Sequence, residues 1–290
     1  MKCLITGVNG VVGKNLSKIL AEKNSFDIWG CGRASNNDEK YFTLDLLDRV
    51  AVLDFFSENN FDCVIHCAAD ISNDVPFEMF SNNLISTLNV VEASLASGVK
   101  KFFNMSSVPV IGEILELPIT EEHPTKPPTA YHLSKLQSEE FIEQFCKSKI
   151  DFINMRIPSP VGRNMPLRSV FPIFLEKIKN NETITLTGHS TRKQNFLDIR
   201  DLASFIYKAS LVDGVSGVFN VASVKPYSNL ELAEAIISRT GSKSKIINDM
   251  VGNSLSLQSW DISTMKAKKS FGFSAEYDLY DTLDWVLSNK

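Results

Sequence analysis

The chain has 290 residues, of which 43% are hydrophobic and 22% are charged, the balance of a globular chain with a sizeable core rather than a disordered one. At this length we expect one large domain with a smaller second lobe. The formal net charge of -4 gives no electrostatic case for nucleic acid as a partner.

Cysteine usage and hydropathy bear on the cellular location of the protein and on metal or membrane binding. The cysteines are odd in number and mostly embedded in apolar runs, which predicts reduced thiols and a cytoplasmic location. Cys63 and Cys67 are possible metal ligands, but no second cluster of Cys or His completes a tetrahedral set, so we expect no metal. No apolar run approaches the roughly 18 residues of a membrane span, and the strand-like start "KCLITG" leaves no room for a signal peptide. We therefore expect no membrane partner.

Strand-like apolar runs alternate with helical patterns through the first two thirds of the chain. Short buried strands separated by helices are typical of right-handed βαβ units on a parallel sheet. The pattern predicts strands at about 2–7, 26–32, 41–46, 62–69, 100–107 and 151–157, and helices at about 13–23, 49–58, 82–97 and 129–148.

The alternation loosens after about Ile157, where four prolines interrupt it. A helix is predicted at 170–179, followed by a strand "TITL", a polar turn "TGHSTRKQ" and a tail of short strands and amphipathic helices. The pattern predicts an α/β fold with a larger parallel-sheet domain over 1–160 and a smaller mixed α/β C-terminal lobe over 161–290. We expect some segments of the lobe to return to the main sheet.

The stretch "ITGVNGVVG" follows the first predicted strand and opens the first predicted helix. Gly7, Gly10 and Gly13 let the chain turn tightly, let backbone N–H groups approach a pyrophosphate, and let the helix pack closely on the strand. Three glycines can also serve a tight turn without any ligand, but their place at the first crossover favours a dinucleotide site. The loop residues assigned to this site with them are Asn9, Val11 and Val12.

The spacing G-x-x-G-x-x-G with Thr6 before it resembles the extended short-chain dehydrogenase/reductase family. Its members include sugar-nucleotide epimerases, dehydratases and 4-keto reductases. The resemblance implies a Rossmann-type doubly wound sheet for the first domain and a substrate-binding role for the second lobe. Further matches follow in the family's order. They imply adenine contacts at Asp45 and Leu46, and a small-residue bend under the pyrophosphate at Cys67, Ala68 and Ala69. They also imply a helix asparagine that supports the active site at Asn83, and a further cofactor contact at Pro158.

The end of the second predicted strand bears on cofactor choice. A protein that binds NAD usually presents an acidic residue there to the ribose hydroxyls, whereas "GCGR" places Gly32 at that position with Arg33 beside it. A missing carboxylate removes repulsion against a 2′-phosphate, and a guanidinium can pair with that phosphate. We therefore favour NADP(H), with NAD(H) as the alternative, in which case Arg33 is a solvated loop cation.

The candidate catalytic residues are Ser107, Tyr131 and Lys135. In the family motif the working serine or threonine stands four residues before a tyrosine, here replaced by Ile111, which gives Ser107 and leaves Ser106 a structural role. On a helix, positions i and i+4 share a face, so Tyr131 and Lys135 would look into one crevice. We expect the lysine ammonium to lower the tyrosine pKa from near 10.

The family assigns these side chains specific roles, which the resemblance carries to this chain. Tyr131 would exchange a proton with a carbonyl or hydroxyl oxygen while hydride moves to or from the nicotinamide. Ser107 would hydrogen-bond the same oxygen, and Lys135 would tune Tyr131 and hold the nicotinamide ribose.

The positions that bind substrate in the family differ in this sequence. Ser159 replaces the usual asparagine of the strand motif, and Gln194 stands where an arginine usually grips a diphosphate. Arg192 is a possible substitute or an exposed turn cation, and the later segment "GNSLSLQSWDISTMK" lacks the second family arginine. Either other cations take their place or the substrate is not a standard nucleoside diphosphate sugar. The candidates for that role are Arg163, Arg168 and Lys193.

The first hypothesis is an NADPH-dependent reductase of a nucleotide-activated 4-keto-6-deoxyhexose, because a net reductase exchanges its cofactor in each cycle. The main alternative is an NAD-dependent nucleotide-sugar 4-epimerase. Reduction of a non-sugar carbonyl and non-catalytic dinucleotide sensing are further alternatives. The family commonly dimerises through the helices predicted at 82–97 and 129–148, and the resemblance implies a homodimer.

Overall fold

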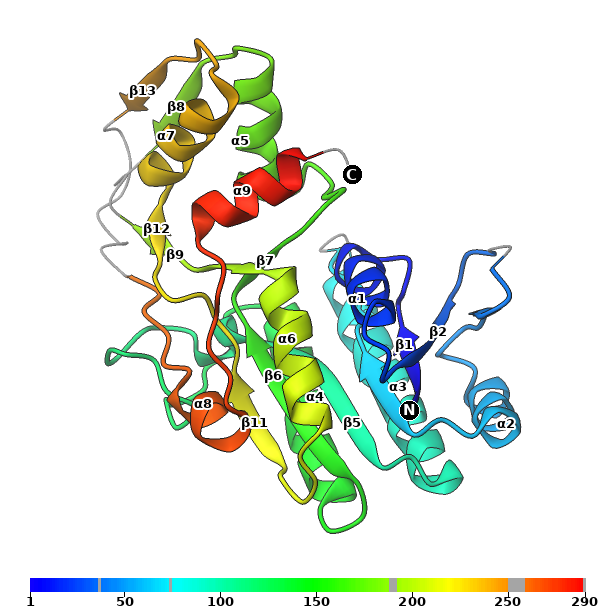
Figure 1. The fold of residues 1–290 in the computed structure, drawn as a ribbon. Helices are drawn as coiled ribbons and strands as arrows, with labels where there is room; N and C mark the ends of the chain where they lie inside the picture. The colour runs from blue at the N-terminus through cyan, green and yellow to red at the C-terminus, as the bar shows by residue number, and fades with distance from the viewer. Residues whose placement is uncertain (36–37, 73–74, 188–191, 250–258, 289–290) are drawn as a thin grey trace.

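The protein is described from a computed structural model that covers residues 1–35, 38–72, 75–187, 192–249 and 259–288. Its main feature is a seven-stranded sheet in the order β11-β6-β5-β4-β1-β2-β3, with parallel neighbours throughout (Figure 1). The strands are β1 (Lys2–Thr6), β2 (Asp27–Gly32), β3 (Tyr41–Thr43), β4 (Cys63–His66), β5 (Lys101–Ser107), β6 (Asp151–Ile157) and β11 (Gly217–Asn220). The predicted Rossmann-type doubly wound sheet is confirmed.

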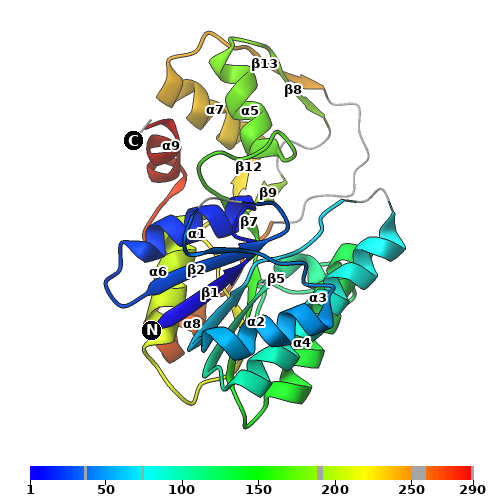
Figure 2. The same ribbon diagram turned by 90° about the vertical axis from the view of Figure 1, so that its right-hand side faces the viewer.

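Helices cover both faces of this sheet, because successive strand residues alternate between two apolar cores. On β1, Cys3 and Ile5 pack into the core beneath α1 (Val11–Ala21) and α6 (Ile199–Ser210), while Leu4 packs into the core on the opposite face. Figure 2 shows the two helical layers on either side of the strands. The opposite face is covered by α2 (Arg49–Asn59), α3 (Pro76–Ser97) and α4 (Ala130–Cys146).

Three predicted boundaries are wrong by three residues or more. Strand β4 ends at His66 instead of 69. Helix α3 begins at Pro76, six residues before the predicted start, because proline is well suited to the first helical position. Strand β3 ends at Thr43 instead of 46, since the chain turns there toward a pocket described below.

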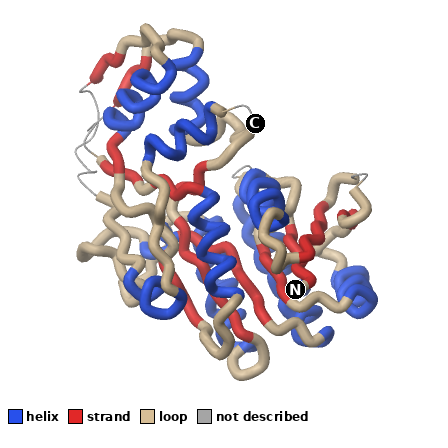
Figure 3. The backbone as a smooth tube through the Cα atoms, viewed as in Figure 1, coloured by secondary structure: helices blue, strands red, loops and turns tan. Residues whose placement is uncertain are grey.

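The second lobe rests on its own apolar core above the carboxyl ends of the main strands. Its helices are α5 (Val170–Lys179), α7 (Asn229–Thr240) and α9 (Leu279–Leu287), and β8 (Ile184–Thr187) pairs in parallel with β13 (Ile246–Asp249). Figure 3 shows this lobe and the loops that join it to the sheet. The predicted polar turn falls partly on 188–191, outside the described residues.

One strand beyond residue 160 belongs to the main sheet, and two helices pack beside it. Strand β11 pairs with β6, α6 packs against α1, and α8 (Met265–Phe271) packs against α6 and β11. The short pairs β7 (Ser159–Val161) with β10 (Phe196–Asp198), and β9 (Lys193–Gln194) with β12 (Tyr227–Ser228), connect the two parts. A domain boundary at 160 stays a prediction.

The described helices include none that is both long enough and apolar enough to cross a membrane. In the same residues no three Cys, His, Asp or Glu side chains gather as metal ligands, and all five cysteines are free thiols.

Candidate active site

The sheet order creates one place where a ligand can enter. From β1 the chain builds outward to β2 and β3, then crosses to β4 on the other side of β1. In open α/β sheets the crevice at such a switch point, outside the carboxyl ends of the strands, is the usual ligand site. The loops after β1 and β4 therefore define the candidate site.

The turn after β1 accepts no side chain at two of its glycines. Gly7 has a positive φ of 64°, and a Cβ there would lie 2.7 Å from the Ala68 Cα. A Cβ on Gly13 would lie 2.5 Å from the Gly7 carbonyl oxygen, whereas one on Gly10 would approach that oxygen only to 3.2 Å. The result is a bare backbone cradle at the start of α1, which is the geometry that a pyrophosphate requires.

A pocket of about 210 Å³ opens over this cradle. The predicted residues that line it are Gly7, Gly10, Arg33, Asp45, Leu46, Cys67, Ala68, Ala69 and Asn83. The remaining predicted cofactor residues lie outside its lining, so their contacts with a cofactor stay predictions: Asn9, Val11, Val12, Gly13, Tyr131, Lys135 and Pro158. Sequence reasoning missed Leu44, Leu47, Asp70, Asn82 and Ser86 as lining residues. Helical periodicity could have found Ser86, which lies three residues after the predicted Asn83 on the same helix.

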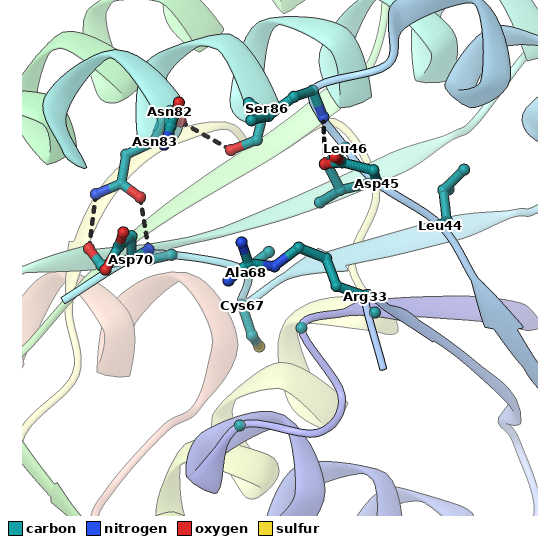
Figure 4. Close-up of a pocket in the computed structure, with 15 residues that line it drawn as sticks. Arg33, Leu44, Asp45, Leu46, Cys67, Ala68, Asp70, Asn82, Asn83 and Ser86 are labelled. Carbon is teal, nitrogen blue, oxygen red and sulfur yellow. Dashed lines mark hydrogen bonds between the residues drawn. The ribbon is translucent and has the colours of Figure 1, made fainter. Parts of the chain in front are cut away.

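Asn83 ties the pocket to the neighbouring helix (Figure 4). The Asp70 backbone N–H donates to Asn83 Oδ1 at 2.6 Å, and Asn83 Nδ2 donates to the Asp70 carbonyl at 2.9 Å and to Ser134 Oγ at 3.3 Å. Since Ser134 lies on α4, this one amide holds the loop after β4 against both α3 and α4.

A buried hydrogen-bond chain supports the same loop from below. Thr6 Oγ1 lies 2.9 Å from His66 Nδ1, and His66 Nε2 lies 3.1 Å from Thr87 Oγ1. Burial lowers the pKa of His66 to about 3, so the ring is neutral. Thr6 Oγ1 also accepts the Ala68 N–H at 3.3 Å, and the chain thus fixes the floor of the pocket. Nothing in the sequence spacing pointed to it.

The three candidate catalytic residues come from two neighbouring elements. Ser107 is the last residue of β5, and the 3-10 helix η1 (Val108–Ile111) that follows it packs against α4. The Thr129 side chain caps α4 by accepting the His132 N–H. Tyr131 and Lys135 then share a face, with Lys135 Nζ 5.8 Å from the centre of the Tyr131 ring.

The electrostatics of this pair differ from the sequence-based expectation. Burial raises the pKa of Tyr131 to about 12, and burial lowers the pKa of Lys135 to about 8, opposed by the nearby Cys67 and Glu139. The expected lowering of the Tyr131 pKa is therefore wrong for the ligand-free protein, because desolvation outweighs the lysine charge. Tyr131 therefore carries its proton near neutral pH.

A buried ion pair lies behind the end of β5. Arg156 Nη2 and Nε donate to Glu139 Oε2 at 2.8 and 3.2 Å, and Ser106 Oγ donates to Glu139 Oε1. Both charged side chains are almost fully buried. The structural role predicted for Ser106 is thus visible: it satisfies Glu139 and fixes the end of β5 next to Ser107.

The predicted substrate residues are spread over the connecting strands. Ser159 begins β7 and Gln194 ends β9, where its Nε2 donates to Asn229 Oδ1 at 2.9 Å. Lys193 Nζ lies 3.5 Å from Glu231, and Arg192 is exposed. The described residues do not show these side chains meeting in one pocket, and 250–258 lie outside the described residues, including the first part of the stretch that lacks the second arginine.

Arg163 does not fit the role suggested for it at the diphosphate. Its Nε donates to the Trp285 carbonyl at 3.0 Å and its Nη2 to Ser288 Oγ at 2.9 Å. The guanidinium also lies 4.8 Å from the centre of the Trp285 ring. Arg163 therefore holds the end of α9, and Arg168 and Lys193 stay candidates.

Comparisons with known proteins agree with this geometry. A family model described as "NAD dependent epimerase/dehydratase family" matches residues 3–222. The UDP-glucose 4-epimerase of Halalkalibacterium halodurans is 26% identical over 315 residues, covering 98% of this chain and 93% of that protein. The solved UDP-glucose 4-epimerase of Thermotoga maritima with UDP-glucose superposes with a TM-score of 0.89 at 21% identity, over 99% of this chain and 97% of that one. The Bordetella bronchiseptica enzyme WbmG, solved with NAD and UDP, gives a TM-score of 0.84 at 23% identity, over 99% and 92%.

Proposed function

This chain belongs to the NAD-dependent epimerase/dehydratase family of enzymes, and from that premise we propose that it is a nucleotide-sugar 4-epimerase. The observation that carries the proposal is the Tyr131–Lys135 pair on one face of α4, where Lys135 is buried and Tyr131 is half-buried. UDP-sugar 4-epimerases among the relatives support it over the reductase first expected from the sequence.

The residues at the switch point fit a nicotinamide dinucleotide. Gly7 and Gly13 leave a cradle that a Cβ would fill, and Asn83 holds the opposite wall. When bound, the dinucleotide supplies the acceptor and donor of the hydride. The backbone around Gly7 and Gly10 would hold its pyrophosphate, and Lys135 its nicotinamide ribose.

Side chains of this protein transfer the proton. Once Tyr131 has lost its own proton to solvent, its phenolate takes the proton of the C4 hydroxyl as a hydride leaves C4 of the sugar, and the resulting phenol gives the proton back when hydride returns to the other face. Ser107 donates a hydrogen bond to the same oxygen. The Lys135 ammonium and the positive charge of an oxidised nicotinamide would both favour this phenolate, against the burial that keeps Tyr131 protonated in the ligand-free protein.

A second candidate is the reduction of a 4-keto-6-deoxyhexose by NADPH. One observation favours it: Gly32 ends β2 and lines the pocket together with Arg33, where the family more often presents an acid to the ribose of NAD. A cofactor used in net reduction has to exchange in every cycle, and NADPH suits that use.

Direct assay separates the two candidates. Purified protein is incubated with UDP-glucose, UDP-galactose and their N-acetyl forms, and products are identified by proton NMR. Interconversion of C4 epimers without net use of cofactor supports the epimerase, and its absence in the Tyr131→Phe variant assigns the proton donor. If no sugar inverts while a nucleotide-linked 4-keto sugar oxidises NADPH, the epimerase proposal is wrong and the reductase stands.

We also propose a homodimer formed through α3 and α4, which pack side by side. Apolar side chains stand exposed on these helices, with Phe77 88% accessible and Ile85, Leu133 and Phe145 each at least 40% accessible. Such a surface suggests a partner. Light scattering of the purified chain tests it, with Phe145→Asp expected to yield monomers. A cytoplasmic location stays a prediction.

A further inference from the structure

A second cavity, of about 730 Å³, lies between α1, α6 and the C-terminal segment that contains α9. Its described lining shares no residue with the pocket over the glycine cradle. Figure 2 shows α9, which carries Trp285, above α1 and α6. The volume is within the range of sites that hold a small molecule, so this cavity can accept a ligand of its own.

Positive charge is concentrated in this cavity. The whole chain has a formal net charge of -4, yet the lining holds six basic side chains and only two carboxylates, those of Glu22 and Glu276. The basic residues are Lys14, Lys18, Lys23, Arg163, Arg200 and Lys208. Even with Arg200 neutralised by Asp198, the cations outnumber the acids, and such a cavity attracts anions.

Three of the cations lie at one end of the cavity. Lys14 and Lys18 are one turn apart on the same face of α1. Between them in sequence, Asn15 Oδ1 accepts the Arg163 N–H at 3.1 Å, and Asn15 Nδ2 donates to the Arg163 carbonyl at 3.0 Å. Arg163 is therefore held beside this part of α1, whereas Glu22 lies about 12 Å along the helix from Lys14.

The two lysines are free to contact a ligand. Both side chains are exposed. Among the residues that the structure describes, no carboxylate lies within ion-pair distance of Lys14 Nζ or Lys18 Nζ. An anion that binds between them therefore does not have to displace an existing partner.

The opposite wall is held in place by stacked arginines and rings. Arg200 Nε and Nη2 donate to Asp198 Oδ1 at 3.0 Å and Oδ2 at 2.7 Å. The Arg200 guanidinium lies 3.7 Å from the centre of the Tyr277 ring and 4.7 Å from that of Trp285. Arg163 lies 4.8 Å from the same Trp285 ring centre. Because these groups are ordered before a ligand arrives, binding beside them costs little side-chain entropy.

We propose that this cavity is a second binding site, for a small anion with two linked phosphate groups, either free pyrophosphate or the diphosphate of a nucleotide. Lys14 and Lys18 bind the phosphate oxygens, and Arg163 adds its charge at the same end. Three neighbouring cations favour a ligand with more than the roughly two negative charges of a single phosphate. Since Lys14 lies on α1 and Trp285 on α9, the ligand joins the first domain to the second lobe. The inference is independent of the sugar reaction proposed above.

Tryptophan fluorescence of the full-length chain, titrated with sodium pyrophosphate, tests the site. The described lining of the cofactor pocket contains no tryptophan, so Trp285 reports on the second cavity. Wild type should show a saturable change in emission, and the Trp285→Phe variant should lose that change. If wild-type emission does not respond, or if the response persists in Trp285→Phe, the proposal is wrong.

Two double variants then assign the charges. Lys14→Gln/Lys18→Gln should weaken pyrophosphate binding about tenfold or more, because contacts between charged groups are lost. Lys177→Gln/Lys179→Gln, which removes the same charge from exposed positions on α5, is the matched control and should stay within about twofold of wild type. Equal weakening in both would mean unspecific attraction by charge. Equal weakening of NADH and pyrophosphate by Lys14→Gln/Lys18→Gln would place the anion at the glycine cradle. Either result overturns the second site.

Titrations with UDP, ADP and UMP identify the ligand, with the part of the signal that requires Lys14 and Lys18 as the measure. Tighter binding of UDP or ADP than of pyrophosphate assigns a nucleotide, and tighter binding of pyrophosphate assigns the free anion. UMP that binds as tightly as UDP contradicts the requirement for two phosphates.

Discussion

Replacing Lys135 by methionine should stabilise the ligand-free protein while it removes activity. Lys135 is only 4% exposed, and its burial lowers the pKa from 10.5 to about 8. Each pKa unit corresponds to about 1.4 kcal/mol, so the buried ammonium costs the folded state about 3 kcal/mol. Methionine keeps the apolar length without the charge. The contact with the Tyr131 ring would be lost, at about 1 kcal/mol, which leaves a net gain of about 2 kcal/mol.

The gain should depend on pH in a defined direction. Folded Lys135 loses its proton near pH 8, whereas the unfolded chain keeps it to about pH 10.4. The penalty is therefore complete below pH 8 and disappears as the pH rises through this window. The Lys135→Met protein should exceed wild type most at pH 7 and least near pH 10.

Urea unfolding of both proteins at pH 7 and pH 9.5, without cofactor, measures the difference. Lys179→Met on the exposed face of α5 is the matched control and should show no pH-dependent gain. A Lys135→Met protein that is no more stable than wild type at pH 7, or whose gain is the same at both pH values, refutes the assigned burial cost.

Three further substitutions test other parts of the account. Gly13→Ala should abolish cofactor binding in a titration, because its Cβ would lie 2.5 Å from a backbone oxygen, while Gly10→Ala should retain measurable binding. Glu139→Gln should lower the free energy of unfolding by about 3 kcal/mol or more, since Arg156 would be left buried without its partner; a loss below about 1 kcal/mol contradicts that. Tyr131→Phe should bind NADPH or NADH as wild type does and show no turnover, and residual turnover above about 1% would mean that another group supplies the proton.

The order of elements was predictable because burial on a parallel sheet leaves short apolar runs between amphipathic helices. Helix α3 was predicted too short: its first turn, from Pro76, carries Phe77 and Glu78 on a solvent-facing side, so no apolar period marks the start. The strand at 41–46 was predicted too long because Leu44 and Leu46 are apolar, although they pack at a pocket wall and not in the sheet.

The site was predictable only where the residues are close in sequence. The glycine turn and the Tyr131–Lys135 spacing are local patterns. The structure places Gly7 and Gly10 at the pocket and the pair on one face of α4, while the role of the pair stays a prediction. The hydrogen bonds of Tyr41 with Asn9 join residues 32 positions apart, and those of His66 with Thr6 join residues 60 apart. Such contacts depend on which strands become neighbours. The pKa of Tyr131 was mispredicted for a related reason, since burial depth cannot be read from spacing.

The fate of the hydrogen at C4 tests the proposed reaction most directly. A UDP-hexose carrying deuterium at C4 is incubated with the protein and its cofactor, and the epimer that forms is examined by NMR and mass spectrometry. An epimerase that removes a hydride from C4 and returns it must retain the deuterium at C4 of the inverted sugar. Inversion with loss of the deuterium, or recovery of the sugar with its C4 configuration unchanged, would contradict the account.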